Sequence, residues 1–317
     1  MERLQLIHNQ IVQNKTASLS SKSPDDIVIC GALRTPLTKS RRGGLKDTPS
    51  ERLIAECMKA LFKKTGLDPK HLQDITLGNV LQPGSGFMVA RMAQFLAGVP
   101  YDVPIHTVNR LCASGLEAIA QVASKIRMGY IDIGLAGGFE NMSQFEMESL
   151  VPPTENLDDE VFETEHARNC MMSMGVTAEN VAERYKITRE EADKFGVESQ
   201  NKAVAAQKNG LFKEEIVPIK TFIKKTDKDG NEIKQEILVD KDDGMRPTTL
   251  EGLAKLKPSF KKGGVCTAGN SSQVRKKNSN IYIFRPPMVL LLFWLPEDLS
   301  LKSLSSPFLP DGFLMLL

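Results

Sequence analysis

The chain has 317 residues, a formal net charge of +2 at pH 7 and 41% hydrophobic residues. This composition is that of a globular protein long enough for one large or two ordinary domains. The near-neutral charge and the lack of a dense basic run argue against nucleic acid as the main partner. The longest apolar run near the C-terminus, Met288–Leu295, is far shorter than the roughly 20 residues that a membrane-spanning helix needs.

The five cysteines are odd in number and include no Cys-x-x-Cys pair. This usage indicates reduced thiols rather than a disulfide framework or a zinc site. The N-terminus has no continuous apolar segment, so the sequence predicts no secretory signal peptide. We therefore expect the cysteines to remain free and available for thiol chemistry.

The first 26 residues are polar and rich in serine and lysine, and we expect them to be disordered. Within them, Arg3-Leu4 followed after five residues by Gln10-Ile11 resembles the N-terminal peroxisomal targeting signal. Such a signal is an address read by an import receptor, and its key side chains here share one face of an amphipathic helix. An ordinary frayed amphipathic terminus is the alternative.

Strands and helices alternate between residues 27 and 141. Four apolar runs are interpreted as buried strands, and the segments between them have helical periodicity. The pattern from Thr48 to Glu51 is interpreted as a capping box with proline at the first helical position. Such alternation predicts a mainly parallel sheet with helices on both faces and with chemistry at the carboxyl ends of the strands. The expected strands are 27–32, 75–81, 106–109 and 131–136, and a short helix is expected at Met88–Leu96.

The stretch Asn109–Ile119 is the centre of this block. An extended run ends at a cysteine, small residues follow, and an apolar-periodic helix continues to Gly129. This order places Cys112 at the N-terminus of a helix, where unpaired N–H groups and the helix dipole favour a thiolate. A thiolate is a nucleophile, and the same N–H groups are able to hold the oxyanion that forms when it attacks a carbonyl. The alternative for any free cysteine is a small buried hydrophobic side chain.

Beyond the fourth strand the alternation stops. An irregular acidic stretch leads to a helix at Ala178–Tyr185, interpreted as capped by Thr177, and to a long helix that opens with a Thr188-to-Glu191 capping box. Asp229-Gly230 between two apolar runs predicts a β-hairpin. We therefore interpret residues 142–266 as an inserted subdomain.

The segment NRLCASGLEAI resembles the nucleophile segment of the thiolases, enzymes that cleave or form 3-ketoacyl-CoA thioesters. ALRTP, GNVLQPGSG and LAGGFENMS also resemble thiolase segments, in the family's order. MGVTAENVAERY and GMRPTTLEGLAKLKPSFKK are similar to the loop domain that covers coenzyme A in that family. The resemblance implies an α/β fold: a thiolase-like N-terminal half, whose mainly parallel mixed sheet has helices on both faces, plus an inserted loop domain. The expected divisions are the core half at 27–141, the loop domain at 142–266 and a return to the core at 267–274.

The resemblance also implies the chemistry. Cys112 is expected to attack the ketone carbonyl of a 3-ketoacyl-CoA, release acetyl-CoA and pass the acyl group to a second CoA. Arg246 and Ser272 match positions that contact CoA, whereas the lysines at 255–262 are interpreted mainly as solvated side chains. CoA is a substrate, and no metal or redox cofactor is implied. The family further implies an enzyme of fatty-acid β-oxidation that forms a homodimer. Together with the N-terminal signal, it implies a location in the peroxisome.

The resemblance ends at about Val274, where a thiolase would continue with an Asp-Gly-Ala strand and a second half. Residues 275–317 instead form a divergent tail of unknown structure, so we expect the C-terminal half of the family fold to be missing. The family's histidine base, its asparagine and its second cysteine are not found, and His106 is the one conceivable substitute base. We therefore expect exposed apolar surface and little turnover from this chain alone.

Two alternatives follow from these departures. The first is a non-catalytic variant that binds acyl-CoA or pairs with the full-length enzyme. The second is another cysteine-dependent condensing enzyme, such as a ketoacyl synthase. The two loop-domain segments resemble thiolases alone and argue against the second alternative.

Overall fold

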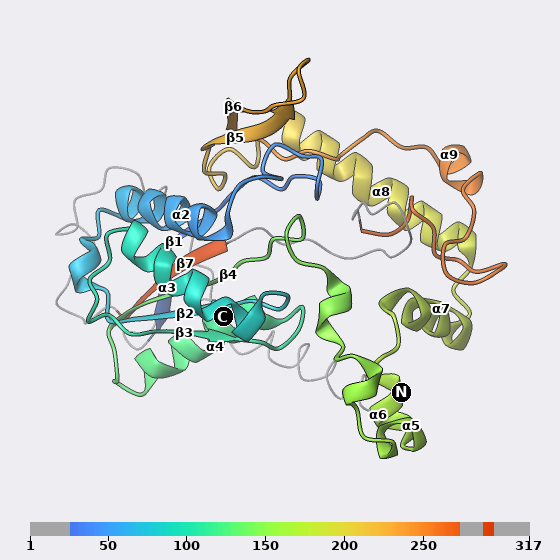
Figure 1. The fold of residues 1–317 in the computed structure, drawn as a ribbon, viewed down its shortest axis with the longest axis horizontal. Helices are drawn as coiled ribbons and strands as arrows, with labels where there is room; N and C mark the ends of the chain where they lie inside the picture. The colour runs from blue at the N-terminus through green and yellow to red at the C-terminus, as the bar shows by residue number, and fades with distance from the viewer. Residues whose placement is uncertain (1–25, 273–287, 295–317) are drawn as a thin grey trace.

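The computed structural model describes residues 26–272 and 288–294, and its core is a five-stranded sheet (Figure 1). The strands are β1 (Ile27–Arg34), β2 (Asp74–Gly78), β3 (Ile105–Val108), β4 (Ile133–Gly138) and β7 (Met288–Trp294). Their order across the sheet is β1-β7-β4-β2-β3. β2 pairs in parallel with β3 and β4, whereas β7 runs antiparallel between β1 and β4. The sheet is therefore mixed, as the resemblance implied, with parallel pairs at β2 and antiparallel pairs at β7.

β7 lies in the tail to which the sequence assigned no structure. Its backbone pairs with β1 from Ile27–Trp294 to Arg34–Met288, and with β4 from Ile133–Phe293 to Gly138–Met288. Helices contact β7 from both faces of the sheet. A central strand of this kind is apolar along its whole length and shows no alternation of polar and apolar residues. An apolar run alone does not distinguish a buried strand from a buried helix segment, so the pairing with β1 and β4 is what identifies β7.

Helices cover both faces of the sheet (Figure 1). They are α2 (Ser50–Thr65) and α3 (Phe87–Leu96) on one face and α4 (Ser114–Arg127) on the other. Ile75 and Leu77 of β2 are fully buried in the cluster formed with α2 and α3. Val122 and Ile126 of α4 pack against Ala136 of β4 on the opposite face. The two apolar faces of the sheet thus explain the helices on both of its sides.

The start of α2 differs from the predicted capping box. Pro49 is the N-cap residue, and no side chain caps the helix. The Thr48 hydroxyl instead lies 2.7 Å from the hydroxyl of Thr221, in a buried contact with the inserted subdomain. The prediction was wrong because Thr48 lies one residue too early to cap the helix, and its partner is distant in sequence.

The elements between β4 and β7, predicted to form the inserted subdomain, lie beside the core, with their long helix extending away from the sheet (Figure 1). These helices and strands are α5 (Glu160–Glu163), α6 (Glu165–Asn169), α7 (Met174–Tyr185), α8 (Arg189–Lys208), β5 (Ile219–Thr226), β6 (Glu232–Val239) and α9 (Leu250–Ala254). Short 3₁₀ turns occur at Pro69–His71, Pro83–Gly86, Met147–Leu150 and Thr154–Asn156. No helix within the ranges 26–272 and 288–294 has the length and apolarity to cross a membrane.

The helix starts in this subdomain follow from side-chain caps. α8 opens with the predicted capping box, because the Thr188 hydroxyl accepts from the Glu191 N–H and the Glu191 carboxylate accepts from the Thr188 N–H. α7 begins at Met174 rather than at the predicted Ala178, since Ser173 is its N-cap. The hairpin of β5 and β6 is confirmed around the predicted turn.

An ion-pair cluster fastens the end of β1 to the inserted subdomain. The Arg34 guanidinium donates to both carboxylate oxygens of Asp242, at 2.7 and 2.8 Å, and its Nε donates to Glu215 at 2.7 Å. The Asp242 carboxylate also accepts from the N–H of Leu37 at 2.7 Å. The pair is bidentate and largely buried, so it fixes the relative orientation of the Arg34 and Asp242 side chains as well as the distance between them.

Deletion of residues 275–317 should lower the free energy of unfolding by about 3 kcal/mol or more, because the backbone hydrogen bonds that β7 makes with both neighbours are lost. Deletion of residues 295–317 alone retains β7 and is the matched control. Urea denaturation followed by circular dichroism measures both variants. Equal midpoints for the two deletions would show that β7 does not support the sheet.

Candidate active site

Cys112 lies in the turn between the end of β3 and the start of α4, and its thiol is free and exposed. The first turn of α4 packs directly on the carboxyl ends of two strands. A Cβ added at Gly78 of β2 would lie 2.4 Å from the carbonyl carbon of Ser114, and one at Gly138 of β4 would lie 3.3 Å from the Cα of Gly115. The glycines therefore let the helix terminus reach the edge where the sequence placed the site.

The turn before Cys112 contains a residue in an unfavourable conformation. Leu111 has a φ of 48°, in the left-handed region that bulky side chains rarely adopt. Its N–H donates to the Asn109 side-chain oxygen at 2.9 Å. Its carbonyl accepts from the N–H and the hydroxyl of Ser114, at 3.0 and 2.5 Å. Hydrogen bonds on both sides of Leu111 thus hold the backbone that carries the thiol.

The helix start also presents polar backbone groups. Within the described ranges, the N–H groups of Gly115 and Leu116 in the first turn of α4 donate to no protein acceptor. Such groups at a helix N-terminus carry partial positive charge and are suited to bind a developing oxyanion. The arrangement is able to support attack by a thiol on a carbonyl.

His106 is not placed as a base for Cys112. Its Nε2 lies 2.9 Å from the side-chain oxygen of Gln121, which is two turns beyond the start of α4, and 3.5 Å from the Thr76 hydroxyl. Its Nδ1 lies 4.0 Å from the Asp74 carboxylate. The ring therefore belongs to a polar cluster near the middle of α4. Two other histidines are exposed, His71 in a 3₁₀ turn and His166 on α6, and His8 lies outside the described residues.

Both positions matched to CoA contacts are exposed, Arg246 on the inserted subdomain and Ser272 in the segment predicted to return to the core. Arg246 precedes α9, and its backbone N–H lies 3.4 Å from the side-chain oxygen of Gln200 on α8. Ser272 is the last described residue of the turn that begins at Thr267. In the part of the chain that the structure describes, neither residue hydrogen-bonds to the turn that carries Cys112. Their role in CoA binding stays a prediction.

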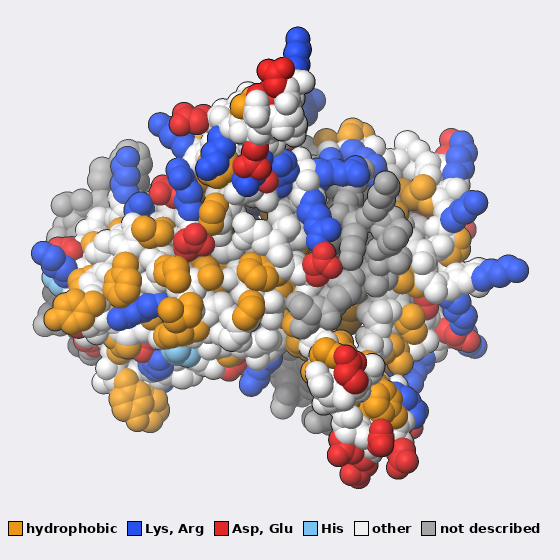
Figure 2. All heavy atoms as spheres, in the orientation of Figure 1, with side chains coloured by type: hydrophobic (Ala, Val, Ile, Leu, Met, Phe, Trp, Pro, Cys, Tyr) orange, Lys and Arg blue, Asp and Glu red, His pale blue; other side chains and the backbone are white. Residues whose placement is uncertain are grey.

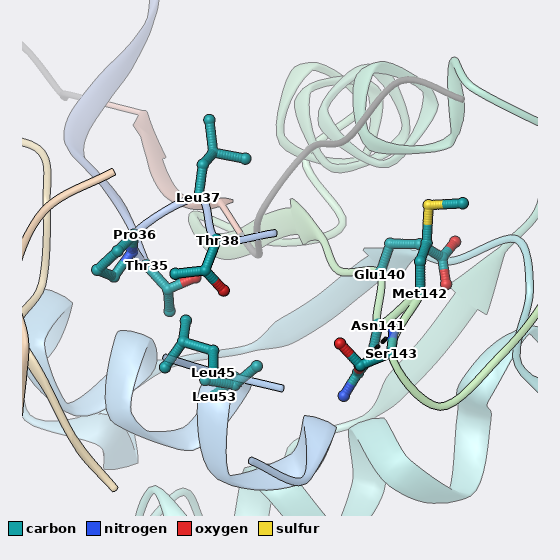
Figure 3. Close-up of a pocket in the computed structure, with 10 residues that line it drawn as sticks. All are labelled: Thr35, Pro36, Leu37, Thr38, Leu45, Leu53, Glu140, Asn141, Met142 and Ser143. Atoms are coloured by element: carbon teal, nitrogen blue, oxygen red, sulfur yellow. Dashed lines mark hydrogen bonds between the residues drawn. The ribbon is translucent and has the colours of Figure 1, made fainter. Parts of the chain in front are cut away.

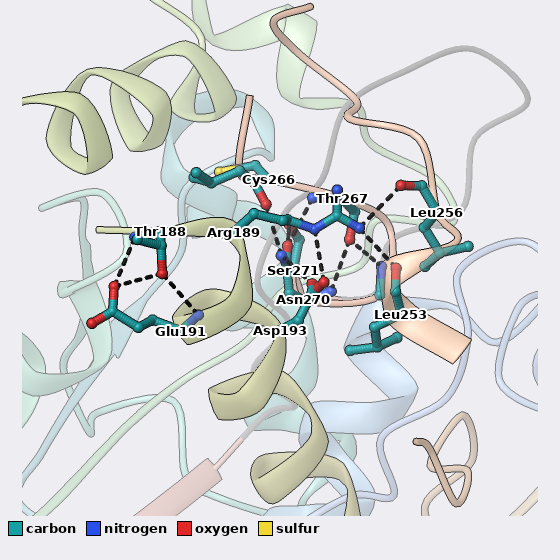
Figure 4. Close-up of polar contacts among 12 residues, drawn as sticks. Thr188, Arg189, Glu191, Asp193, Leu253, Leu256, Cys266, Thr267, Asn270 and Ser271 are labelled. Carbon is teal, nitrogen blue, oxygen red and sulfur yellow. Dashed lines mark hydrogen bonds and ion pairs between the residues drawn. The ribbon is translucent and has the colours of Figure 1, made fainter. Parts of the chain in front are cut away.

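A buried polar cluster holds the turn that ends at Ser272 (Figure 4). The Asp193 carboxylate of α8 accepts from Arg189 Nε and from the Asn270 amide, each at 2.8 Å. The Asn270 side-chain oxygen accepts from the N–H of Thr267 at 2.7 Å. Sequence reasoning missed Asp193, although its spacing from Arg189 on one helix face offered a signal.

Glu179 of α7 fixes the segment before this turn. The residue is 4% exposed, and its carboxylate accepts from the N–H groups of Val265 and Cys266 at 2.9 Å. Burial, together with the negative charge of Glu179, raises the pKa of the Cys266 thiol to about 11. Burial alone raises the pKa of Cys30 to about 12. Both groups therefore remain thiols at neutral pH.

A pocket lies between the loop after β1 and the loop after β4 (Figure 3). Its lining residues are Thr35, Pro36, Leu37, Thr38, Leu45, Leu53, Glu140, Asn141, Met142 and Ser143. Cys112 is not among them, so the pocket is separate from the thiol. Glu140 connects the pocket to the loop after β2, because it lines the pocket and its carboxylate accepts from the N–H groups of Val80 and Leu81 at 3.1 and 3.2 Å.

Glu140 was not selected from the sequence, although it is an acidic residue directly after an apolar strand. Its side chain is partly buried at the end of β4 and also accepts from the Asn79 amide at 3.2 Å. Burial raises the pKa of its carboxyl, and this effect outweighs the opposing hydrogen bonds from Val80, Leu81, Asn141 and Asn79.

Known proteins share this architecture. The family described as thiolase, N-terminal domain, matches residues 27–277. 3-ketoacyl-CoA thiolase A, peroxisomal, of Mus musculus is 46% identical over 260 residues, covering 82% of this chain and 59% of that protein. 3-ketoacyl-CoA thiolase, peroxisomal, of Homo sapiens is 47% identical over 264 residues, covering 83% and 60%. The crystal structure of the dimeric peroxisomal thiolase of Saccharomyces cerevisiae matches with a TM-score of 0.75 and 33% identity, covering 90% of this chain and 67% of that one.

The fold is an α/β core with an inserted subdomain, and an exposed cysteine lies at the carboxyl edge of its sheet. The chain belongs to the thiolase family. The predicted fold class and the resemblance stated from the sequence are confirmed. The chain spans about 60% of the length of the two curated relatives above.

Gly78→Ala should lower the free energy of unfolding by about 1–3 kcal/mol, because the added methyl group would push the first turn of α4 off β2. Gly115→Ala is the matched control, since a Cβ there meets no atom within 4 Å. The control should be neutral or stabilising by up to about 1 kcal/mol, as expected for alanine in a helix. Urea denaturation compares the variants, and equal losses would contradict the close contact.

Brief labelling with iodoacetamide at about pH 8 should modify Cys112 and Cys170 first, because both thiols are exposed. Cys30 and Cys266 should react slowly because of their raised pKa values, and Cys57 because it is buried. Peptide mass spectrometry measures each site, and a urea-unfolded sample provides the reference in which all five react. Preferential labelling of Cys266 would contradict the described environment.

Proposed function

We propose that this chain acts as a 3-ketoacyl-CoA thiolase, an acetyl-CoA C-acyltransferase of fatty-acid β-oxidation, with Cys112 as its nucleophile. The observation that supports this most strongly is the position of that thiol. It is exposed in a hydrogen-bonded turn at the N-terminus of α4, on the carboxyl edge of a thiolase-family sheet. The family relatives are named for this activity.

The first half-reaction transfers the acyl group to the protein. Cys112 Sγ forms a bond with the ketone carbon C3 of a 3-ketoacyl-CoA, and the carbonyl oxygen becomes an oxyanion near the N–H groups of Gly115 and Leu116. The oxyanion collapses, the C2–C3 bond breaks, and its electron pair passes to C2. The proton lost from the thiol is balanced by one gained at C2, so acetyl-CoA leaves and an acyl–Cys112 thioester remains.

The second half-reaction returns the thiol. The sulfur of a second CoA attacks the thioester carbonyl, the bond to Cys112 breaks, and the proton lost from the CoA thiol is balanced by one gained at Cys112 Sγ as the shortened acyl-CoA departs. Arg246 and Ser272 are proposed to contact CoA, because both are exposed and a guanidinium suits phosphate groups. CoA takes part as substrate, and the proposed chemistry uses no metal or redox cofactor.

We propose a homodimer in the peroxisome. The thiolase of Saccharomyces cerevisiae is named as a dimeric peroxisomal enzyme, and the mouse and human relatives are named as peroxisomal. Apolar side chains gather over the region of α3 (Figure 2), a surface suited to burial against another subunit. The exposed side chains there are Phe87, Met88, Met92, Phe95 and Leu96. The targeting signal and the import receptor proposed to read it concern residues 3–11, which lie outside the described residues.

A non-catalytic acyl-CoA-binding or dimer-partner protein is the second candidate. It is favoured by the contacts of His106, whose ring bonds to Gln121 rather than to Cys112. In such a protein the substrate would bind without forming a thioester.

Incubation with acetoacetyl-CoA should add one acetyl group to Cys112, detected by mass spectrometry of the intact protein and of its peptides. Cys112→Ala should remain unmodified, and addition of CoA should remove the group from the wild type. Binding of CoA is measured in parallel by calorimetry. CoA binding without any adduct would refute the thiolase activity and support the non-catalytic acyl-CoA-binding protein. Equal thiolysis rates for wild type and Cys112→Ala would also refute catalysis by Cys112.

A further inference from the structure

A short chain of hydrogen bonds connects the ends of β2 and β4 to the turn that carries Cys112. Asn109 forms its middle link. Its side-chain amide donates to the carbonyl of Val80 at 3.3 Å, and its side-chain oxygen accepts from the N–H of Leu111 at 2.9 Å. One side chain thus joins the loop after β2 to the residue that precedes the thiol.

Glu140 holds the other end of this chain of bonds. Its carboxylate accepts from the N–H groups of Val80 and Leu81, while its second oxygen accepts from the amide of Asn79. Asn79 is 1% exposed, and its amide also donates to the carbonyl of Phe139 at 2.7 Å. The loop that offers the Val80 carbonyl to Asn109 is therefore fixed from the end of β4.

The chain of hydrogen bonds holds Leu111 in its unfavourable conformation. A leucine at a φ of 48° is strained relative to ordinary backbone, and persists only where the surroundings determine it. Ser114 holds its carbonyl side, and Asn109 holds its N–H side. Loss of the Asn109 link would release Leu111 toward a relaxed conformation and move the neighbouring sulfur.

We propose that Asn109 and Glu140 are positioning residues for Cys112. Glu140 orders the loop after β2, and Asn109 transmits that order to the turn before the thiol. The inference rests on the proposed function, because it assigns these residues to the acylation of Cys112. Neither side chain is proposed to touch the reacting atoms.

The test combines two measurements on the full chain. The first is the single-turnover rate of Cys112 acetylation by acetoacetyl-CoA, and the second is amide hydrogen exchange of Leu111 and its neighbours. Asn109→Ala and Glu140→Ala should each slow acetylation at least about tenfold, as small displacements of a reacting group do. Each should also accelerate exchange at Leu111 several-fold, although Glu140 does not contact that residue. Ser124→Ala removes a hydrogen bond to Ala120 elsewhere on α4 and serves as the control.

Conservative variants separate the links. Asn109→Asp keeps the acceptor for the Leu111 N–H but loses the donor to Val80, so it should behave like Asn109→Ala. Glu140→Gln keeps a carbonyl oxygen for the N–H groups of Val80 and Leu81 and should restore most of the rate lost in Glu140→Ala. The double variant of Asn109→Ala with Glu140→Ala should be no slower than the slower single variant, because both act through one link.

The outcomes are distinct. Full acetylation in Asn109→Asp, or rate losses that multiply in the double variant, would overturn the connection between Glu140 and Asn109. Exchange that rises throughout the sheet, together with a lower melting temperature, would assign the residues to general stability and overturn the positioning role. Failure of the wild type to become acetylated would refute the proposed function and, with it, the assignment of these residues to acylation. In that case, local exchange at Leu111 would still decide whether Glu140 orders the turn.

Discussion

The close approach of α4 to the ends of β2 and β4 is the constraint on which the site depends. Gly78 and Gly138 leave room for the helix backbone, so the first turn of α4 lies on the strands themselves. That contact sets the height of Cys112 above the sheet edge. It also brings Asn109 within reach of Val80. The site is therefore defined by backbone packing first and by side-chain hydrogen bonds second.

Polar contacts over long sequence distances determine how the inserted subdomain is held. Arg34 bonds to Asp242 where β1 ends, and Thr48 meets Thr221 where α2 begins. Within the subdomain, Asp193 secures the turn that leads back toward the core. Because these contacts are buried or largely buried, losing one partner leaves the other without compensation, which is costly. These contacts thus fix the orientation of the subdomain relative to the core, in addition to the covalent connection of the chain.

Much of the fold could be predicted because its signals are local. Alternating apolar runs gave the strands and helices of the core, and the strand, cysteine and helix order placed Cys112. Predictions failed where the deciding partner is remote: Thr48 bonds across to Thr221 instead of capping α2, and β7 is defined by its neighbours in the sheet. Glu140 was missed for the same reason, because its partners Val80 and Leu81 belong to another strand end.

The place of β7 in the sheet has a consequence for the order of folding. Ile27 pairs with Trp294, so strands from opposite ends of the described chain must meet before β1 and β4 are joined. Contacts this distant in sequence form slowly. During synthesis, β1 and β4 emerge long before Trp294 and wait with unpaired edges. Nascent chains of this protein therefore depend on protection from aggregation until β7 arrives.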